Sequence, residues 1–264
     1  MLDEREQALL NSVVNNLDEI LLNQNPKPIG YIDISNRFSS AIWYEEIQKT
    51  KIVVGGCGGI GSFLVFLLSR VNPLNITVFD PDDIDYSNLS GQLFALKDVN
   101  NSKCESISRF VREYSSYYHI HVFKSLYTND SLKEDVMICG FDNMAARKVF
   151  FENWLSRVNS KLNPKDMLFI DGKLAAEEFE ILCIKGDDKE AIERYQREFL
   201  FSDEEAAETT CSYKQTTFMT NMIASYMVNL FVNFIANKCN PVFPRDVPFY
   251  TYYNCKTMYL KQEM

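Results

Sequence analysis

A glycine-rich stretch is the first feature of the chain that could do chemistry. Residues 55–61 read Gly-Gly-Cys-Gly-Gly-Ile-Gly, directly after the β-branched run 51–54 and before the apolar stretch 63–71. Glycines allow backbone N–H groups to lie against phosphate oxygens, and the N-terminus of a following helix favours negative charge. No Gly-Lys-Ser or Gly-Lys-Thr closes the stretch, which excludes a Walker-type loop. The stretch predicts a nucleotide-phosphate site, with a tight turn as the alternative, and its candidate ligands are Gly56, Gly58, Gly59, Gly61 and Ser62.

A carboxylate follows the next hydrophobic run. Residues 75–79 have the pattern of a buried strand, and Asp80 comes directly after it. At the end of the second strand of a nucleotide-binding sheet, a carboxylate commonly accepts hydrogen bonds from ribose hydroxyls. A turn cap is the alternative. The order strand, glycine turn, helix, strand and acid within about thirty residues predicts a βαβ unit.

Strands and helices continue to alternate after this unit. The hydrophobic pattern predicts further strands at 120–124, 135–139, 167–170 and 178–184, and helices at 102–114, 144–158 and 215–237. The stretch 248–261 alternates aromatic and polar residues, which predicts a strand or hairpin. The expected fold class is α/β, a doubly wound, mostly parallel sheet with flanking helices and a C-terminal helix plus hairpin.

The composition changes little along the chain, so it indicates few domain boundaries. Residues 1–50 are expected to form an N-terminal helix, at 3–22, and a lead-in to the first strand. Residues 51–264 are expected to form a single domain, because no repeat or Gly/Ser linker interrupts them. Within that domain, 186–214 is rich in acidic residues and poor in large apolar ones, which predicts a mobile, partly helical segment.

Four motifs in sequence order carry a family resemblance. The glycine stretch is followed by an acidic and polar motif at 80–92, by Lys103, and by Asp142-Asn143 with Arg147 four residues on. The matching residues of the second motif are Asp80, Asp82, Ser87, Asn88, Leu89 and Gln92. This pattern resembles the ThiF/MoeB/HesA-type adenylyltransferases, the family of ubiquitin-activating enzymes, over residues 37–172. The resemblance implies a Rossmann-like adenylation domain over 51–264, with 186–214 as a crossover-like segment.

The activity that the resemblance implies is ATP-dependent adenylation. The substrate would be the C-terminal carboxylate of a ubiquitin-like or sulfur-carrier protein, or of a peptide. The cofactors would be ATP and Mg²⁺, without zinc. The chain would act as a homodimer on a partner with a flexible C-terminal tail.

The resemblance also implies a role for each matched residue. Asp80 would hold the ribose, Lys103 would neutralise phosphate charge, and Asp142 would hold Mg²⁺. The remaining residues of the nucleotide motif would orient phosphate and carboxylate, and they are Asp82, Asn88 and Gln92. From the residue types alone, Asp142-Asn143 could equally cap a helix that begins near residue 144. Arg147 is expected to be structural.

Two positions depart from the family pattern. Gly91 and Ser40 stand where the family has arginines that face phosphate. Loss of a transition-state cation can lower a rate by about 10³-fold or more. Either other cations substitute, or the site binds nucleotide without efficient adenylation. The candidate substitutes are Arg37, Lys97, Lys124 and Lys173.

Cys211 is a second candidate for chemistry, just before the helix predicted at 215–237. The resemblance implies that the crossover segment delivers a nucleophilic cysteine here, and a cysteine at a helix N-terminus has a lowered pKa. A small buried residue is the alternative. The other cysteines are expected in the core, with the first too confined in the glycine stretch to react, and they are Cys57, Cys104, Cys139, Cys183, Cys239 and Cys255.

Composition and charge restrict the partners. With 27 Lys and Arg against 36 Asp and Glu, the formal charge of −9 disfavours nucleic acid. The seven cysteines include no C-x-x-C pair, which disfavours zinc sites and disulfides and favours a reducing cytoplasm. The N-terminus shows no secretion signal. The apolar stretch 218–236 carries a polar residue at every fourth position, which predicts a helix packed on a core rather than a membrane span.

Three other functions fit part of the pattern. A nucleotide-binding pseudoenzyme that scaffolds an active partner is favoured by the missing arginines. An NAD-dependent oxidoreductase needs only the glycine stretch and Asp80, and leaves Lys103 and Asp142 without a role. The third is an adenylating enzyme for a small molecule or a tRNA, and the acidic charge disfavours the tRNA.

Overall fold

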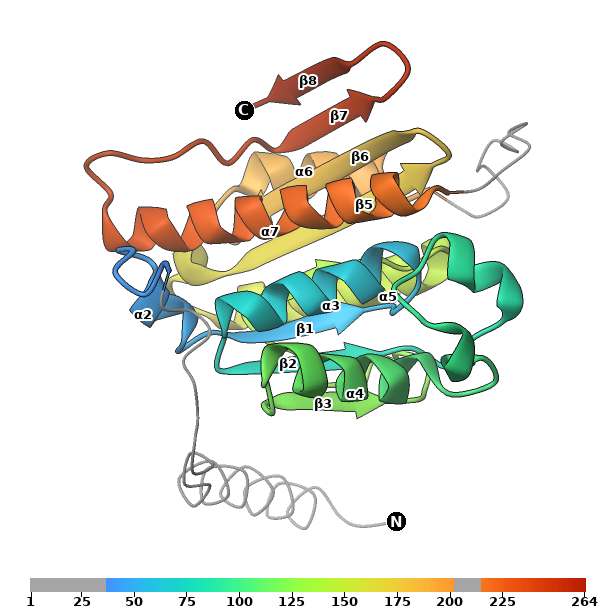
Figure 1. The fold of residues 1–264 in the computed structure, drawn as a ribbon. Coiled ribbons are helices and arrows are strands. Elements are labelled where there is room, and N and C mark those ends of the chain that lie inside the picture. The colour runs from blue at the N-terminus through green and yellow to red at the C-terminus, as the bar shows by residue number, and fades with distance from the viewer. Residues whose placement is uncertain (1–36, 202–214) are drawn as a thin grey trace, which may run out of the picture. The chain divides into compact units, whose positions relative to one another are not determined.

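The computed structural model describes residues 37–201 and 215–264. The helix predicted at 3–22 and the candidate nucleophile Cys211 lie outside these described residues. Those that are described build an eight-stranded sheet with the order β3-β2-β1-β4-β5-β6-β7-β8 (Figure 1). The α/β fold class predicted from the sequence is confirmed.

The first five strands of the sheet are parallel. They are β1 (Lys51–Gly55), β2 (Asn75–Phe79), β3 (Ile120–Phe123), β4 (Val136–Cys139) and β5 (Leu168–Ala175). Strand order reverses at β1, which lies between β2 and β4. In a doubly wound sheet, ligands bind at such a switch point, outside the carboxyl ends of the strands. The residues after β1, β2 and β4 therefore form the expected binding edge.

The remaining three strands are antiparallel to their neighbours. They are β6 (Glu178–Lys185), β7 (Tyr250–Asn254) and β8 (Tyr259–Glu263). The last two form the hairpin that the alternating aromatic and polar residues predicted. Tyr252 and Asn254 of this hairpin each hydrogen-bond Glu178 of β6, at 2.8 and 2.7 Å, and thereby attach the hairpin to the sheet.

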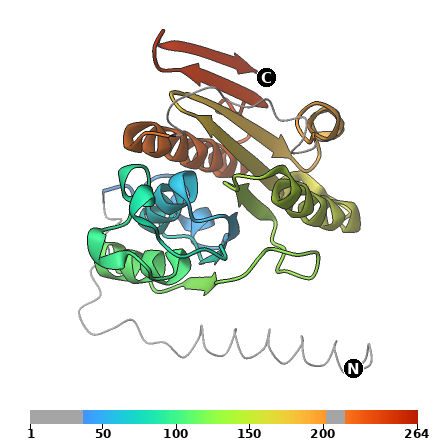
Figure 2. The same ribbon diagram turned by 90° about the vertical axis from the view of Figure 1, so that its right-hand side faces the viewer.

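Helices cover both faces of the sheet, as Figure 2 shows. One face carries α3 (Gly59–Val71), α4 (Lys103–Ser115) and α7 (Thr217–Cys239), and the other carries α5 (Met144–Ser160) and α6 (Lys189–Glu198). Alternate residues of each strand face the two layers. In β1, for example, Ile52 and Val54 belong to the core under α3, whereas Val53 belongs to the core under α5. Short helices complete the described residues at α2 (Tyr44–Ile47), η1 (Tyr86–Ser90), η2 (Leu96–Asp98) and η3 (Pro164–Asp166).

The helix α7 is long and apolar enough to cross a membrane by length and composition. In the structure, 61% of its apolar window is buried, and it packs on α3 and on β5 and β6. Its polar side bonds to the chain that follows, since Asn233 and Asn237 donate to the carbonyls of Asp246 and Arg245 at 3.0 and 2.9 Å. This agrees with the prediction of a helix packed on a core.

Two elements differ from the sequence prediction. Helix α3 begins at Gly59 and not at 63, so the last glycines of the stretch form its first turn. Within the acidic segment 186–214, α6 is well packed, and its Tyr195 is completely buried. The helix α6 confirms that the segment is partly helical. Its acidic residues lie on the exposed side and made the apolar side hard to recognise in the sequence.

Candidate nucleotide-binding site

The glycine loop between β1 and α3 is tightly folded. Gly56 has a φ of +87°, in the left-handed region that favours glycine. A Cβ on Gly61 would stand 2.0 Å from the carbonyl oxygen of Gly56, so α3 can approach the loop only with glycine there. Gly58, the N-cap of α3, supplies no side-chain cap, which leaves N–H groups of the first turn for an anion.

Asp80 lies directly beside this loop. Its Oδ2 accepts the N–H of Cys57 at 2.6 Å, and its Oδ1 accepts the N–H of Asp82 at 2.9 Å. Burial raises the pKa of the Asp80 carboxyl, and the charge of Lys103 opposes that rise. A carboxylate has about four acceptor sites, so these two bonds leave capacity for ribose hydroxyls.

Lys103, the first residue of α4, brings a cation to the same edge. Its Nζ lies 2.7 Å from Oδ2 of Asp82, and its backbone N–H donates to the carbonyl of Asp82 at 3.1 Å. Burial alone lowers the pKa of Lys103, but the Asp82 hydrogen bond and the Asp80 charge outweigh it and raise the pKa above its ordinary value. The structure thus brings three of the predicted residues together around a charged ammonium.

The polar motif after β2 folds into the helix η1. Asp85 and Asn88 cap it reciprocally, with Oδ1 of Asn88 accepting the N–H of Asp85 at 3.0 Å. Gln92 is buried, its amide nitrogen lies 3.8 Å from where a Cβ on Gly58 would stand, and its Oε1 has no hydrogen-bond partner among the described residues. Buried polar atoms are rarely left unpaired, so Oε1 of Gln92 is an acceptor available to a hydrogen-bond donor.

Ser62 holds the loop in place. It is completely buried, its hydroxyl accepts the N–H of Leu93 at 3.0 Å, and it lies 3.3 Å from the carbonyl of Gly59. These bonds tie α3 to the chain that follows η1. Ser62 therefore helps to fix the position of the loop.

The Asp142-Asn143 motif follows β4, at the same edge. Asp142 is exposed, and Asn143 caps α5 by accepting the N–H of Ala146 at 2.8 Å. The helix-cap interpretation is therefore correct for Asn143. Mg²⁺ is commonly held by one or two carboxylates plus substrate phosphates, and the exposed carboxylate of Asp142 fits that requirement. The described residues contain no cluster of three or more His, Cys, Asp or Glu that could hold a metal.

Arg147 is structural, as predicted. It is buried and forms an ion pair with Asp171, which is completely buried. The guanidinium also donates to the carbonyls of Phe141 and Gly172. The other carboxylate oxygen of Asp171 accepts the hydroxyl of Tyr195 at 2.9 Å. The network joins α5, β5 and α6 beneath the site.

Neither of the positions at which the resemblance implies an arginine carries a cationic side chain. Ser40 is exposed, and Gly91 is buried. Of the four candidate substitutes, one directly follows the carboxyl end of a strand and another lies within a strand. Lys124, after β3, pairs with Asp83 at 2.6 Å. Lys173, in β5, donates to the carbonyl of Phe199 at 3.0 Å, and burial lowers its pKa.

Most of the described cysteines are core residues, as predicted. Burial raises the pKa of both Cys104 and Cys183 to about 12, which makes them poor nucleophiles. Cys57 is fully buried in the glycine loop, and its pKa is also raised by burial. The prediction was too strong for Cys239 and Cys255, which are only half-buried.

Sequence reasoning missed two residues that contact the glycine loop and the turn after η1, one in α7 and one just before it. Gln215 contacts the glycine loop, and Thr220 donates to the carbonyl of Gly91 at 3.0 Å. Only the space left by Gly91 could have indicated that another side chain fills it.

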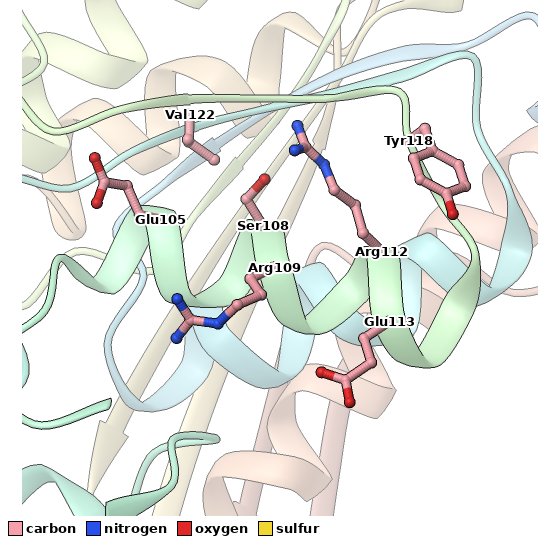
Figure 3. A pocket seen from close by; sticks show the side chains of 7 residues that line it. All are labelled: Glu105, Ser108, Arg109, Arg112, Glu113, Tyr118 and Val122. Carbon is pink, nitrogen blue, oxygen red and sulfur yellow. The ribbon is translucent and has the colours of Figure 1, made fainter. Parts of the chain in front are cut away.

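A hollow of about 520 Å³ lies elsewhere, between α4 and β3 (Figure 3). None of the predicted site residues lines it. Its lining residues are Glu105, Ser108, Arg109, Arg112, Glu113, Tyr118 and Val122. The candidate site is therefore a surface at the carboxyl ends of the strands and not this hollow.

The fold defines an α/β domain of the doubly wound class, with the candidate site at the carboxyl ends of its parallel strands. The ThiF family model matches residues 33–262, and the chain belongs to the ThiF family. The NEDD8-activating enzyme E1 catalytic subunit of Caenorhabditis elegans is 34% identical over 110 residues, which cover 40% of this chain and 26% of that protein. The adenylyltransferase and sulfurtransferase UBA4 of Debaryomyces hansenii is 28% identical over 137 residues, covering 50% and 31%. The chain thus spans less than a third of these curated relatives.

Solved structures share the fold at low sequence identity. Escherichia coli MccB, solved with ATP, matches with a TM-score of 0.61 and 16% identity, covering 90% of this chain and 72% of that one.

Proposed function

We propose that this protein is an ATP-dependent adenylyltransferase that activates the C-terminal carboxylate of a small protein or peptide. Family membership and the names of the relatives support the reaction class. The observation that carries the proposal is that a carboxylate, a cation and the glycine loop meet at one edge of the sheet. There, Asp80 bonds the glycine loop at 2.6 Å, and Lys103 is held 2.7 Å from Asp82.

The reaction matches what these groups can do. A carboxylate oxygen of the partner attacks the α-phosphorus of ATP, an O–P bond forms, and the bond from that phosphorus to the bridging oxygen breaks. Pyrophosphate leaves with the bonding electron pair. Negative charge grows on the phosphate oxygens, where the loop N–H groups and the Lys103 ammonium can stabilise it. Asp80 holds the ribose and thereby fixes the α-phosphate beside them.

The metal assignment is part of the same proposal. Asp142 would hold Mg²⁺ through its exposed carboxylate. When bound, the ion supplies charge neutralisation to the phosphates. Gln92 and Asn88 supply neutral hydrogen bonds that orient phosphate and carboxylate without adding charge.

Two further proposals concern the identity of the partner protein and the step that follows adenylation. The names of the relatives favour a ubiquitin-like or sulfur-carrier protein whose flexible C-terminal tail reaches Lys103 and Asp142. Cys211 would then take the acyl group as a thioester, with release of AMP. We place the reaction in a cytoplasmic homodimer, without zinc.

A scaffold function is the second candidate, and Gly91 is the observation that favours it. Without an arginine at this position, the site could bind ATP and yet adenylate a carboxylate slowly. Such a protein would position an active partner.

ATP–pyrophosphate exchange separates the two candidates. The assay is run with Mg²⁺, with and without a candidate partner that ends in Gly-Gly. Partner-dependent exchange is expected, and Lys103→Met should lower it by about 10²-fold or more. Lys256→Met, which removes an exposed lysine near the C-terminal hairpin, is the matched control. ATP binding without exchange for any partner would favour the scaffold.

A further inference from the structure

The edge strand β3 lacks the charged residues and the proline that usually protect the edge of a sheet. Its residues, Ile120–Phe123, include no Pro, Lys, Arg, Asp or Glu, and the side chain of Phe123 is 46% exposed. The opposite edge, β8, carries Lys261 and Glu263, which pair with each other at 2.6 Å. Because unprotected edges pair with strands of other chains, β3 is the more available of the two edges.

The backbone of β3 has hydrogen-bonding groups on its outer side. The carbonyls of His119 and Phe123 accept N–H groups of β2 and of the residue that follows it, at 3.0 and 3.1 Å. Alternate residues of a parallel strand bond the same neighbour, so the N–H and C=O groups of Ile120 and Val122 point away from β2. A further strand can pair with these groups.

A second copy of this chain would supply such a strand by antiparallel pairing about His121. Ile120 of one copy would lie opposite Val122 of the other, and their outward groups would form hydrogen-bonded pairs on both sides of the two-fold axis. Phe123 would lie opposite His119, which sets two aromatic rings side by side and covers the exposed phenyl ring.

The helix α4 carries opposite charges at the two ends of the hollow between α4 and β3. Glu105 and Arg112 are exposed and extend from α4 on the side of Val122, as Figure 3 shows. Arg109 pairs with Asp98 at 2.5 Å, whereas Arg112 has no ion pair among the described residues. The guanidinium of Arg112 is therefore available to a carboxylate.

The same pairing about His121 brings these charges together. Sγ of Cys104 lies 3.4 Å from the carbonyl of Phe123, so the start of α4 lies beside the end of β3. His121 is two residues back along β3, or about 6.6 Å. The same distance along α4 is about 4.4 residues beyond Cys104, which is midway between Glu105 and Arg112. A two-fold axis at this level sets Glu105 of each copy opposite Arg112 of the other.

We propose that two copies of this chain form a symmetric dimer through β3, with their sheets joined edge to edge and Glu105 of each copy paired with Arg112 of the other. This inference rests on the homodimer proposed above and assigns its surface. The hollow between α4 and β3 is filled by α4 of the second copy. None of the predicted site residues lines this hollow, so dimerisation and adenylation can be tested separately.

The test measures the mass of the full chain in solution by sedimentation over a range of concentrations. The wild type should form a dimer. Glu105→Arg and Arg112→Glu each create two like-charged pairs across the axis and should raise the dissociation constant by about 10-fold or more. Glu152→Arg, which makes the same change of charge at an exposed position of α5, should dimerise like the wild type.

An equimolar mixture of the two charge variants tests the pairing itself. In the mixed dimer, a chain with two arginines at these positions faces a chain with two glutamates, so both ion pairs return. The mixture should therefore sediment as a dimer at concentrations at which each variant alone is a monomer. This rescue also shows that both variants are folded.

Three outcomes would overturn the inference. Charge variants that dimerise as tightly as the wild type would place the interface on another surface. A mixture that stays monomeric would refute the pairing of Glu105 with Arg112. A wild type that is monomeric at every concentration would refute the homodimer as well, and would leave the edge of β3 to a strand of another protein. ATP–pyrophosphate exchange by such a monomer would leave the proposed reaction intact.

Discussion

Replacement of Arg147 by methionine tests whether this residue stabilises the fold or binds the nucleotide. Arg147 and Asp171 are 6% and 0% exposed, so the substitution leaves a buried carboxylate without its cation. The hydroxyl of Tyr195, at 2.9 Å, would remain its partner. The carbonyl of Gly172, now 3.0 Å from the guanidinium, would also lose its donor.

The expected magnitude is large. Removal of one member of a buried ion pair destabilises a protein by about 3–5 kcal/mol. At ~2–4 °C per kcal/mol for a domain of this size, the melting temperature should fall by roughly 6 to 20 °C. Asp171→Asn, added to Arg147→Met, removes the unpaired charge but keeps an acceptor for Tyr195. The double variant should therefore be more stable than Arg147→Met alone.

Thermal unfolding and ATP affinity are measured on the same samples, below the melting temperature of every variant. Lys148→Met is the matched control, because Lys148 is the next residue of α5 and is exposed. The folded fraction of Arg147→Met should bind ATP within a few-fold of the wild type. An Arg147→Met protein that melts like the wild type but no longer binds ATP would refute the structural assignment.

Two further predictions concern the loop and its carboxylate. Gly61→Ala places a methyl 2.0 Å from a backbone oxygen and should destabilise the protein by about 1–3 kcal/mol in thermal unfolding. Gly58→Ala is the control, because the nearest contact of its methyl is at 3.8 Å, and it should not destabilise the protein. Equal melting temperatures of the two variants would contradict this prediction. Because burial raises the pKa of Asp80, its carboxylate should protonate at a higher pH than the ordinary value of about 3.9, so ATP affinity should fall as the pH drops toward that raised pKa. Asp80→Asn should bind ATP weakly and remove this dependence, and an affinity that stays flat down to pH 4 would count against a role for Asp80.

Much of the fold could be predicted because local patterns and tertiary structure agree. The β-branched run at 51–54 and the run at 75–79 became β1 and β2, as buried parallel strands must be apolar on both faces. Boundaries were less certain. Helix α3 starts inside the glycine stretch, because glycine there permits close packing that outweighs its low helix propensity.

Site residues that stand in local motifs could be predicted, Asp142 after β4 included, whereas a residue that approaches from a distant part of the chain could not. Asp80, Asp82 and Lys103 meet because β2 ends, and α4 begins, at the same edge of the sheet. Gln215 is separated from Gly91 by more than a hundred residues, and no local pattern links them. Its approach depends on how α7 packs against α3, which is a property of the tertiary structure.

Whether the glycine loop and Lys103 form an ATP site is tested most directly by measuring the binding of Mg·ATP and of NAD to the wild-type chain and to Lys103→Met. We expect that ATP binds, that NAD does not displace it, and that Lys103→Met weakens ATP binding by at least about 10-fold, since a buried charged hydrogen bond is lost. Tight binding of NAD, or ATP affinity that does not depend on Lys103, would contradict this expectation.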